Sequence, residues 1–272
     1  SGLRRLDEEG VRFRSHVDGS AHLLSPERSL EVQQNLGADV VMAFDECPPG
    51  DAPREAVAEA TARTTRWARR SLAAHHRQDQ WLFGIVQGGG HLDLREASAR
   101  ELMELAFPGY AIGGLSVGEP KPARDRVLEH LDAILPQEQP RYLMGVGTPE
   151  DLIDSVARGI DLFDCVLPTR NARNGQLFTA RGRLAIRNAR HRADPRPPDP
   201  GCACPTCSST SRAYLRHLHL ANEMSAATLM SVHNLFFYLD MMRQLRQSIR
   251  LCRFEEWRKD TLRRLAEGQD EP

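Results

Sequence analysis

Residues 81–115, WLFGIVQGGGHLDLREASARELMELAFPGYAIGGL, contain one complete copy of the pattern that decides the fold. The two apolar runs, at residues 81–87 and 110–115, are short and uninterrupted, which is typical of parallel strands buried on both faces. The residues between them have a helical pattern. A strand, a helix and a second strand in this order predict a βα unit of a parallel sheet.

The same pattern continues on both sides of this unit. Apolar runs also occur at residues 39–46, 141–146 and 162–167, separated by longer helix-patterned stretches. An N-cap residue, a proline and early acids mark two helix starts, at Ser25-Pro26-Glu27 and Thr148-Pro149-Glu150. We therefore expect five buried parallel strands in an α/β fold, and we interpret residues 1–10 as a loop.

The positions of polar residues and glycines distinguish between two α/β architectures. An open doubly wound sheet and part of a TIM (β/α)8 barrel both contain such units. No G-x-G-x-x-G motif opens a helix, and Gly88-Gly89-Gly90 is more typical of a turn. Polar residues and glycines follow the predicted strands, at the rim where barrel enzymes build their sites, and this favours the barrel; they are Asp45, Gln87, Gly113, Gly114, Gly145, Gly147 and Asp164.

Composition and charge exclude several classes of protein. The 272 residues are 40% hydrophobic and 27% charged, which is typical of a globular protein. There is no apolar run of eighteen residues and no leader pattern, so we expect no membrane contact and a cytoplasmic location. The net charge is −1, yet residues 169–196 carry eight arginines and one acid. Such a segment fits either a phosphate-contacting surface or a solvated face.

A different pattern begins after Arg170. Residues 176–179 and 183–187 flank Ala180-Arg181-Gly182, which predicts a hairpin, and a helical pattern covers residues 215–265. We expect a partial barrel over 1–174, a zinc-binding subdomain over 175–234 and a C-terminal helical segment over 235–272 that packs on the barrel.

Three cysteines lie within six residues, at Cys202, Cys204 and Cys207. Without an export signal, three thiols at this spacing indicate a tetrahedral Zn²⁺ site with a structural role. The spacing leaves three candidates for the fourth ligand, which are His217, His219 and His233. His233 follows the apolar run 228–232, where we expect the chain to turn back. The isolated Cys47, Cys165 and Cys252 are interpreted as core packing.

Two acidic positions suggest chemistry at the rim. From the residues alone, Asp164 is best interpreted as a helix cap or as the partner of Arg170 or Arg173. Asp45, Glu46 and Gln87 would line a pocket for a flat heterocycle that carries N–H groups and a carbonyl. Two carboxylates on different strands also suit displacement at a sugar carbon.

Six segments together resemble one known family. They are VMAFDEC at 41–47, GIVQGG at 84–89, GGLSVGE at 113–119, YLMGVGT at 142–148, FDCVLPTRNAR at 163–173 and the cysteine cluster. In this order and spacing they look like the bacterial-type tRNA-guanine transglycosylases. The resemblance implies a zinc-containing TIM-barrel transferase that exchanges guanine at the wobble position of certain tRNAs for a 7-deazaguanine, on the way to queuosine. It further implies a homodimer with one structural zinc ion per chain.

The resemblance also assigns roles to residues. Asp164 corresponds to the nucleophile that attacks the ribose, and Asp45, Gln87, the Gly114 N–H and Met144 correspond to groups that hold the base. It implies tRNA contacts by Gly145, Val146, Gly147, Thr148, Pro149, Glu150, Asp151, Thr169, Arg170, Asn171, Ala172 and Arg173. The implied zinc ligands are Cys202, Cys204, Cys207 and His233.

Two further expectations follow from the resemblance. A bulky residue at Val117 would exclude the larger base queuine and favour its precursor preQ1. Family members carry three further strands before the position of Ser1, and this part includes an Asp-Ser-Gly-Gly motif whose aspartate is the general acid/base. No such motif occurs in the 272 residues, so we expect about the last five barrel strands and little activity from this chain alone. The alternatives are a non-catalytic tRNA-binding subunit or inactive fragment of the same fold, and a zinc hydrolase, which would need metal ligands at the strand ends.

Overall fold

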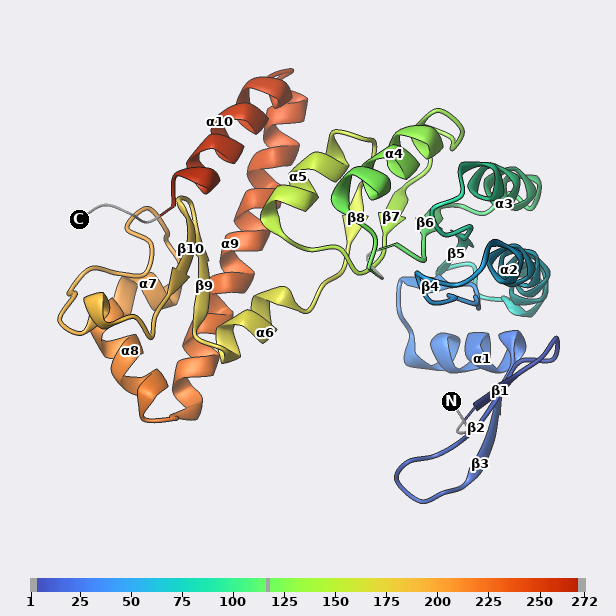
Figure 1. The fold of residues 1–272 in the computed structure, drawn as a ribbon, viewed down its shortest axis with the longest axis horizontal. Helices are drawn as coiled ribbons and strands as arrows, with labels where there is room; N and C mark the ends of the chain where they lie inside the picture. The colour runs from blue at the N-terminus through green and yellow to red at the C-terminus, as the bar shows by residue number, and fades with distance from the viewer. Residues whose placement is uncertain (1–3, 116–117, 269–272) are drawn as a thin grey trace. The chain divides into compact units, whose positions relative to one another are not determined.

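The computed structural model describes residues 4–115 and 118–268 and contains two compact units. Unit 1 comprises Ser1–Val146 and Ser155–Asp164, and unit 2 comprises Gly147–Asp154 and Cys165–Pro272. The elements of each unit are shown in Figure 1. We describe the units separately.

A parallel sheet forms the centre of unit 1. Its strands are β4 (Val40–Met42), β5 (Trp81–Val86), β6 (Tyr110–Ile112), β7 (Arg141–Leu143) and β8 (Leu162–Phe163), and their order in the sheet follows their order in the chain. Each strand pairs in parallel with the next. This order is that of successive barrel units and confirms the predicted half-barrel of five strands. The strands are shorter than predicted because the residues at their carboxyl ends leave the ladder and enter the loops.

Helices α1 (Pro26–Leu36), α2 (Arg54–Ala74), α3 (Leu92–Glu104) and α4 (Lys121–Asp132) connect or precede these strands. Buried side chains such as Leu82, Ile112 and Leu128 form one core between sheet and helices. The predicted start of α1 is confirmed, since the Ser25 hydroxyl accepts the Arg28 N–H at 3.2 Å and Gly37 ends the helix at φ 72°.

The interpretation of residues 1–10 as a loop was wrong for residues 4–6, which form a strand; residues 7–10 form a turn, and residues 1–3 lie outside the described residues. An antiparallel sheet in the order β1-β2-β3 includes β1 (Arg4–Leu6), which pairs with β2 (Val11–Arg14), and β2 pairs with β3 (Ala21–Leu24). Most of these side chains are exposed, and although Val11–Arg14 alternates apolar and polar residues, the sequences of β1 and β3 do not. Backbone pairing between neighbouring segments, rather than burial, defines these strands.

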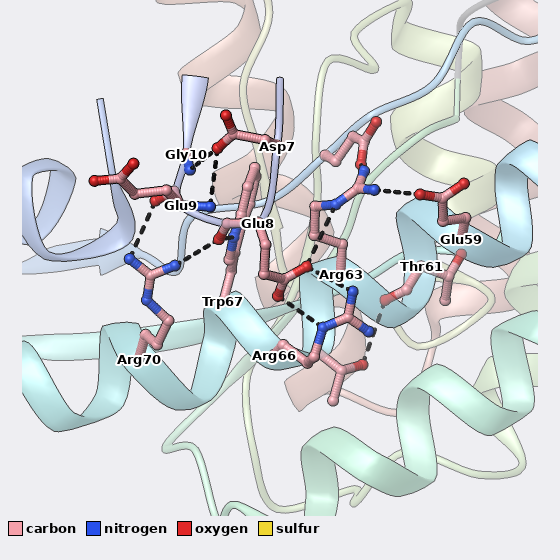
Figure 2. A network of polar contacts seen from close by, with 12 residues as sticks. Asp7, Glu8, Glu9, Gly10, Glu59, Thr61, Arg63, Arg66, Trp67 and Arg70 are labelled. Carbon is pink, nitrogen blue, oxygen red and sulfur yellow. Dashed lines mark hydrogen bonds and ion pairs between the residues drawn. The ribbon is translucent and has the colours of Figure 1, made fainter. Parts of the chain in front are cut away.

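The turn between β1 and β2 is fixed to α2 by a polar network (Figure 2). The Glu8 carboxylate pairs with Arg66 at 2.7 Å, and the Glu8 carbonyl accepts hydrogen bonds from the Trp67 indole at 2.9 Å and from Arg70 at 2.7 Å. The Trp67 ring stacks on Phe44, with ring centroids 4.9 Å apart. Phe44 precedes Asp45, so the same helix contacts both the antiparallel sheet and the loop after β4.

Unit 2 contains the predicted hairpin, with β9 (Gln176–Thr179) paired to β10 (Gly182–Ala185). The helical region is divided among α8 (Arg212–Leu220), α9 (Met224–Arg250) and α10 (Phe254–Glu267), preceded by α6 (Leu167–Arg173), the 3-10 helix η1 (Ala189–His191) and α7 (Pro205–Ser209). Helix α5 (Pro149–Val156) begins in unit 2 and ends in unit 1. Helix α9 is continuous through residue 234, so the expected boundary between the zinc-binding subdomain and the C-terminal segment falls inside one helix. The division of the chain at residues 174 and 234 stays a prediction.

No helix among residues 4–115 and 118–268 combines the length and apolar character needed to cross a membrane.

We predict that Trp67→Ala lowers the free energy of unfolding by about 3–5 kcal/mol, because a fully buried indole, its ring contact and its hydrogen bond are lost together. Urea unfolding monitored by circular dichroism measures this change. Arg69→Ala, on the exposed side of the same helix, is the control and should change stability by less than about 0.5 kcal/mol. A loss below about 1 kcal/mol in Trp67→Ala would contradict the anchoring role.

Candidate active site and metal site

The predicted rim residues of unit 1 follow the strand ends as expected. Asp45 lies three residues after β4, Gln87 directly after β5, Gly113 directly after β6 and Asp164 directly after β8. The structure brings the first two into contact, since the Gln87 side-chain amide donates a hydrogen bond to the Asp45 carboxylate at 2.6 Å. Met144 lies directly after β7 and is half-buried.

Helix α2 holds the loop that carries Asp45. The Phe44 N–H donates to the Ser71 hydroxyl at 3.2 Å, and the Glu46 N–H donates to the Thr64 hydroxyl at 3.0 Å. The Glu46 carboxylate forms an ion pair with Arg63 of the same helix. Peptide groups on both sides of Asp45 are therefore fixed, which orients its side chain toward Gln87. Burial raises the pKa of Asp45 above its ordinary value of 3.8, opposed by the hydrogen bond from Gln87.

Gln87 and Gly114 form a close pair. Gln87 is fully buried, and its side-chain carbonyl oxygen has no hydrogen-bond partner among the described residues. Gly114 has φ +63°, and a Cβ at this position would overlap that oxygen. Glycine at position 114 is therefore required both by the backbone conformation and by the space that Gln87 occupies.

A cavity in unit 1 lies beside this pair. Its lining includes Pro48, Val57, Gln87, His91, Gly114 and Glu119. The Cys47 thiol is exposed, and the Gly114 N–H interacts with it. Cys252 is exposed and Cys165 is partly buried. The interpretation of Cys47 and Cys252 as core residues was therefore wrong, because their loops lie at the surface of the molecule. Val117 lies outside the described residues.

The Asp164 carboxylate is exposed and held on one side. One of its oxygens accepts hydrogen bonds from the Tyr142 hydroxyl at 2.6 Å and from the Gly145 N–H at 2.8 Å. Neither oxygen forms an ion pair with a described residue of unit 1, and the second oxygen has no hydrogen-bond partner there. Asp164 is also not the N-cap of the following helix, which is Val166. The carboxylate is thus oriented and keeps one oxygen available to a ligand.

Sequence reasoning missed the role of Tyr142. Burial, together with the Asp164 carboxylate, raises the pKa of the Tyr142 phenol far above its ordinary value, so the hydroxyl remains a proton donor at neutral pH. Its position in the register of β7 and β8, where it pairs with Leu162, brings the phenol next to Asp164. The sequence did contain a signal for this contact, because Tyr142 lies on the predicted strand next to the one that ends at Asp164.

The residues expected to contact tRNA are divided between the units. Gly145 and Val146 belong to unit 1, whereas Gly147–Asp151 and the residues of α6 belong to unit 2. Helix α5 begins at Pro149, with the Thr148 hydroxyl accepting the Asp151 N–H at 3.2 Å. On α6, Arg170 and Arg173 are exposed, while the Ala172 side chain is fully buried in the core of unit 2. The Ala172 side chain therefore cannot contact a ligand, whereas those of Arg170 and Arg173 can.

Unit 2 gathers Cys202, Cys204, Cys207 and His233 into one cluster. Their ligand atoms all lie within 4.8 Å of one another, and the His233 Nδ1 lies 3.9, 3.4 and 3.3 Å from the three sulfur atoms in that order. His217 and His219 are not part of this cluster. The turn expected near residue 232 does not occur, because α9 continues to Arg250. His233 lies on the buried side of this helix and contacts the cysteines from there.

The chemistry of this cluster fits a metal ion. The His233 Nε2–H donates to the Phe178 carbonyl at 2.7 Å, which leaves Nδ1 as the ligand atom, and the Cys207 N–H donates to the Cys204 sulfur at 3.3 Å. Burial raises the pKa of Cys204, but its contacts with His233 and with the Cys207 N–H oppose this effect and lower the pKa to about 6. A thiol with a lowered pKa supplies the thiolate that metals bind. Four donors of this kind can hold one tetrahedral ion.

The fold and these sites define an α/β half-barrel with polar strand ends and a separate Cys3His metal site. The family model described as queuine tRNA-ribosyltransferase matches residues 1–267. Among similar proteins, the queuine tRNA-ribosyltransferase of Pelotomaculum thermopropionicum is 56% identical over 262 residues, covering 96% of this chain and 71% of that protein. The enzyme of the same name from Staphylococcus aureus is 54% identical over 261 residues, covering 96% and 69%. The chain belongs to the queuine tRNA-ribosyltransferase family, a family of enzymes.

Proposed function

We propose that this protein exchanges guanine at the wobble position of tRNA for the 7-deazaguanine preQ1, through a covalent ribosyl ester on Asp164. The observation that carries the proposal is the state of the Asp164 carboxylate, with one oxygen fixed by Tyr142 and Gly145 and the other without a partner in unit 1. Membership of the transglycosylase family supports the reaction class.

In the first step, the available oxygen of Asp164 attacks C1′ of the wobble nucleoside. The bond between C1′ and N9 of guanine breaks, and its electron pair leaves with the base, which then takes up a proton. In the second step, the ring nitrogen of the incoming base gives up its proton and attacks C1′ from the opposite side, releasing the Asp164 carboxylate. Two inversions give net retention at the sugar. Hydrogen bonds to one oxygen suit this cycle, because they orient the nucleophile and stabilise it as a leaving group.

The base would bind beside Asp45 and Gln87. Asp45 would accept hydrogen bonds from the ring and exocyclic N–H groups, and Gln87 and the Gly114 N–H would donate to the carbonyl of the base. The Gln87 amide donates to Asp45 through its nitrogen, and this direct contact between the two side chains supports a polar ligand at this position. Met144 would stack on the base, and Val117 would restrict its size, which favours preQ1 over larger bases.

The RNA would be bound by residues 145–151 and by α6. The exposed Arg170 and Arg173 suit contacts with phosphates, since arginine recognises them in a bidentate geometry. A tRNA with a wobble guanine, the free bases preQ1 and guanine, and a second copy of this chain are the partners that the proposal implies. Its location would be the cytoplasm, where tRNA is modified.

We assign the Cys3His cluster to one Zn²⁺ ion with a structural role. When bound, the ion would crosslink the loop at 202–207 to α9. Its four protein donors would leave no coordination position for a substrate.

We predict that Asp164→Asn abolishes both base exchange and the RNA adduct that resists denaturation, because an amide cannot replace the carboxylate as nucleophile. Incubation of the full-length gene product with tRNA, followed by a denaturing gel, measures the adduct. Asp45→Ala is the control and should still form the adduct, because this change weakens base binding and leaves the nucleophile in place. An adduct of normal yield in Asp164→Asn would refute the mechanism. Absence of any adduct with the unsubstituted protein would instead favour a non-catalytic tRNA-binding subunit.

We predict that guanine binding weakens as the pH falls. The loss should begin at a pH above 3.8, which is the ordinary pKa of an aspartic acid side chain. Burial raises the pKa of Asp45, so this carboxyl is protonated at a higher pH than usual and then no longer accepts both N–H groups of the base. Isothermal titration calorimetry across pH 4–8 measures the affinity. The same titration with Asp45→Asn should show a weaker and flatter profile; an unchanged pH dependence in this variant would exclude Asp45 as the titrating group.

We predict that the purified protein contains one zinc ion per chain and that Cys204→Ser loses it. Because metal binding contributes directly to folding, the hairpin and helices of unit 2 should also become more susceptible to proteolysis. Elemental analysis and limited proteolysis measure the two effects. Cys252→Ser, outside the cluster, serves as the control and should retain the metal. Full zinc content in Cys204→Ser would show that the cluster is not the binding site.

A further inference from the structure

Arg95, on α3 of unit 1, is a fully buried arginine without a carboxylate in ion-pair distance among the described residues. Its guanidinium instead donates four hydrogen bonds to backbone carbonyls. The acceptors belong to the ends of two neighbouring strands and are Val86 at 2.8 Å, Gly89 at 2.8 Å, Gly113 at 2.7 Å and Gly114 at 3.2 Å. Burial lowers the pKa of Arg95 to about 10, so the side chain still carries its charge at neutral pH.

One of these bonds determines the direction of the Gly114 N–H. The Gly113 carbonyl and the Gly114 N–H belong to the same peptide group, and no cis peptide bond occurs in the described residues. In a trans peptide the two groups point in opposite directions. Because the carbonyl points at Arg95, the N–H points away from it, toward the Cys47 thiol beside the cavity. The second bond, to the Gly114 carbonyl, fixes the other side of the same residue at φ +63°.

Helix α3 fixes the backbone of Gln87 in the same way. The Val86 carbonyl accepts from Arg95, and the Gln87 N–H, which belongs to the same peptide group, donates to the Ser98 hydroxyl at 3.2 Å. Arg95 and Ser98 are both buried and lie almost one turn apart. The two groups that we propose for the base carbonyl, Gln87 and the Gly114 N–H, therefore take their positions from one helix.

The charge of Arg95 also changes the strength of the Gly114 donor. A cation that binds the carbonyl of a peptide withdraws electron density from its N–H, and hydrogen bonds in such a chain strengthen one another in a buried environment. Lysine cannot reproduce this arrangement, because a single ammonium group lacks the planar fork that reaches carbonyls on two strands.

We propose that Arg95 is a positioning residue that aims and strengthens the Gly114 N–H, and fixes Gln87, for recognition of the carbonyl oxygen of the base. This inference rests on the proposed function, because it concerns the same base site. When the bond between C1′ and N9 breaks, electron density moves onto the purine, including its carbonyl oxygen. A donor strengthened by a buried cation stabilises that charge without contact between Arg95 and the base.

Binding of two bases to two proteins tests this inference. Guanine has the carbonyl oxygen, whereas 2-aminopurine lacks this oxygen and the neighbouring ring N–H that faces Asp45; Asp45 is present in both proteins, so the change in the ratio of the two affinities reports on the carbonyl contact. We expect Arg95→Lys to weaken guanine binding about tenfold, in line with the loss of a charge-assisted hydrogen bond, and to change 2-aminopurine binding less than about twofold. Calorimetric titration of the full-length gene product measures both affinities.

Arg141→Lys is the matched control. Arg141 is also a buried arginine of unit 1 that binds backbone carbonyls, including that of Leu135, but it lies at the start of β7, away from the strand ends. Its replacement should leave the ratio of the two affinities unchanged, whatever its effect on stability.

Equal losses for both bases in Arg95→Lys would overturn the inference, because a scaffold role alone does not distinguish the carbonyl. If Arg95→Lys does not fold, Ser98→Ala gives the decision: a loss of a few-fold for guanine that exceeds the loss for 2-aminopurine supports the inference, and equal losses overturn it. Failure of the unsubstituted protein to bind guanine would refute the proposed function itself.

Discussion

Peptide groups that leave a parallel sheet at its carboxyl end lose their ladder partners, and the structure of unit 1 depends on how these groups are satisfied. Buried polar groups without hydrogen bonds cost free energy, so each loop needs donors and acceptors from elsewhere. Helices supply them here: Ser71 and Thr64 of α2 accept from the loop after β4, and Arg95 of α3 donates to the loops after β5 and β6. The same bonds orient the side chains that we assign to base recognition. Stability and site geometry thus have a common physical origin.

The two acidic groups of the proposed site have contrasting environments. Asp45 is partly buried and accepts a hydrogen bond from Gln87, whereas Asp164 is exposed and receives two hydrogen bonds on one oxygen. A partly buried acceptor suits recognition of N–H groups, and an oriented, accessible carboxylate suits attack on a sugar carbon. Different environments of this kind allow residues of one chemical type to perform different tasks.

Unit 2 solves a separate problem. Three sulfur atoms and a ring nitrogen come from a short loop and from the middle of a long helix, and Phe178 of the hairpin fixes the histidine tautomer. The cluster therefore joins the hairpin, the cysteine loop and α9. The exposed arginines of α6 belong to the same unit, so a metal ion in the cluster would stabilise the elements around the surface that we propose for RNA.

The five parallel strands, the hairpin, the cap of α1 and the residues at the strand ends could be predicted from the sequence, because each depends on local pattern or on fixed positions of glycine, proline and polar residues. The family resemblance added His233, which spacing alone left equivalent to His217 and His219. The remaining features depend on contacts between residues that are distant in the chain. The strands before residue 25 are defined by backbone pairing between largely exposed segments. Helix α9 continues past residue 232, where a turn was expected, and His233 contacts the cysteines from the buried side of this helix. Tyr142 and Arg95 acquire their roles from neighbouring strands and from carbonyls distant in sequence, and such contacts leave no local signal.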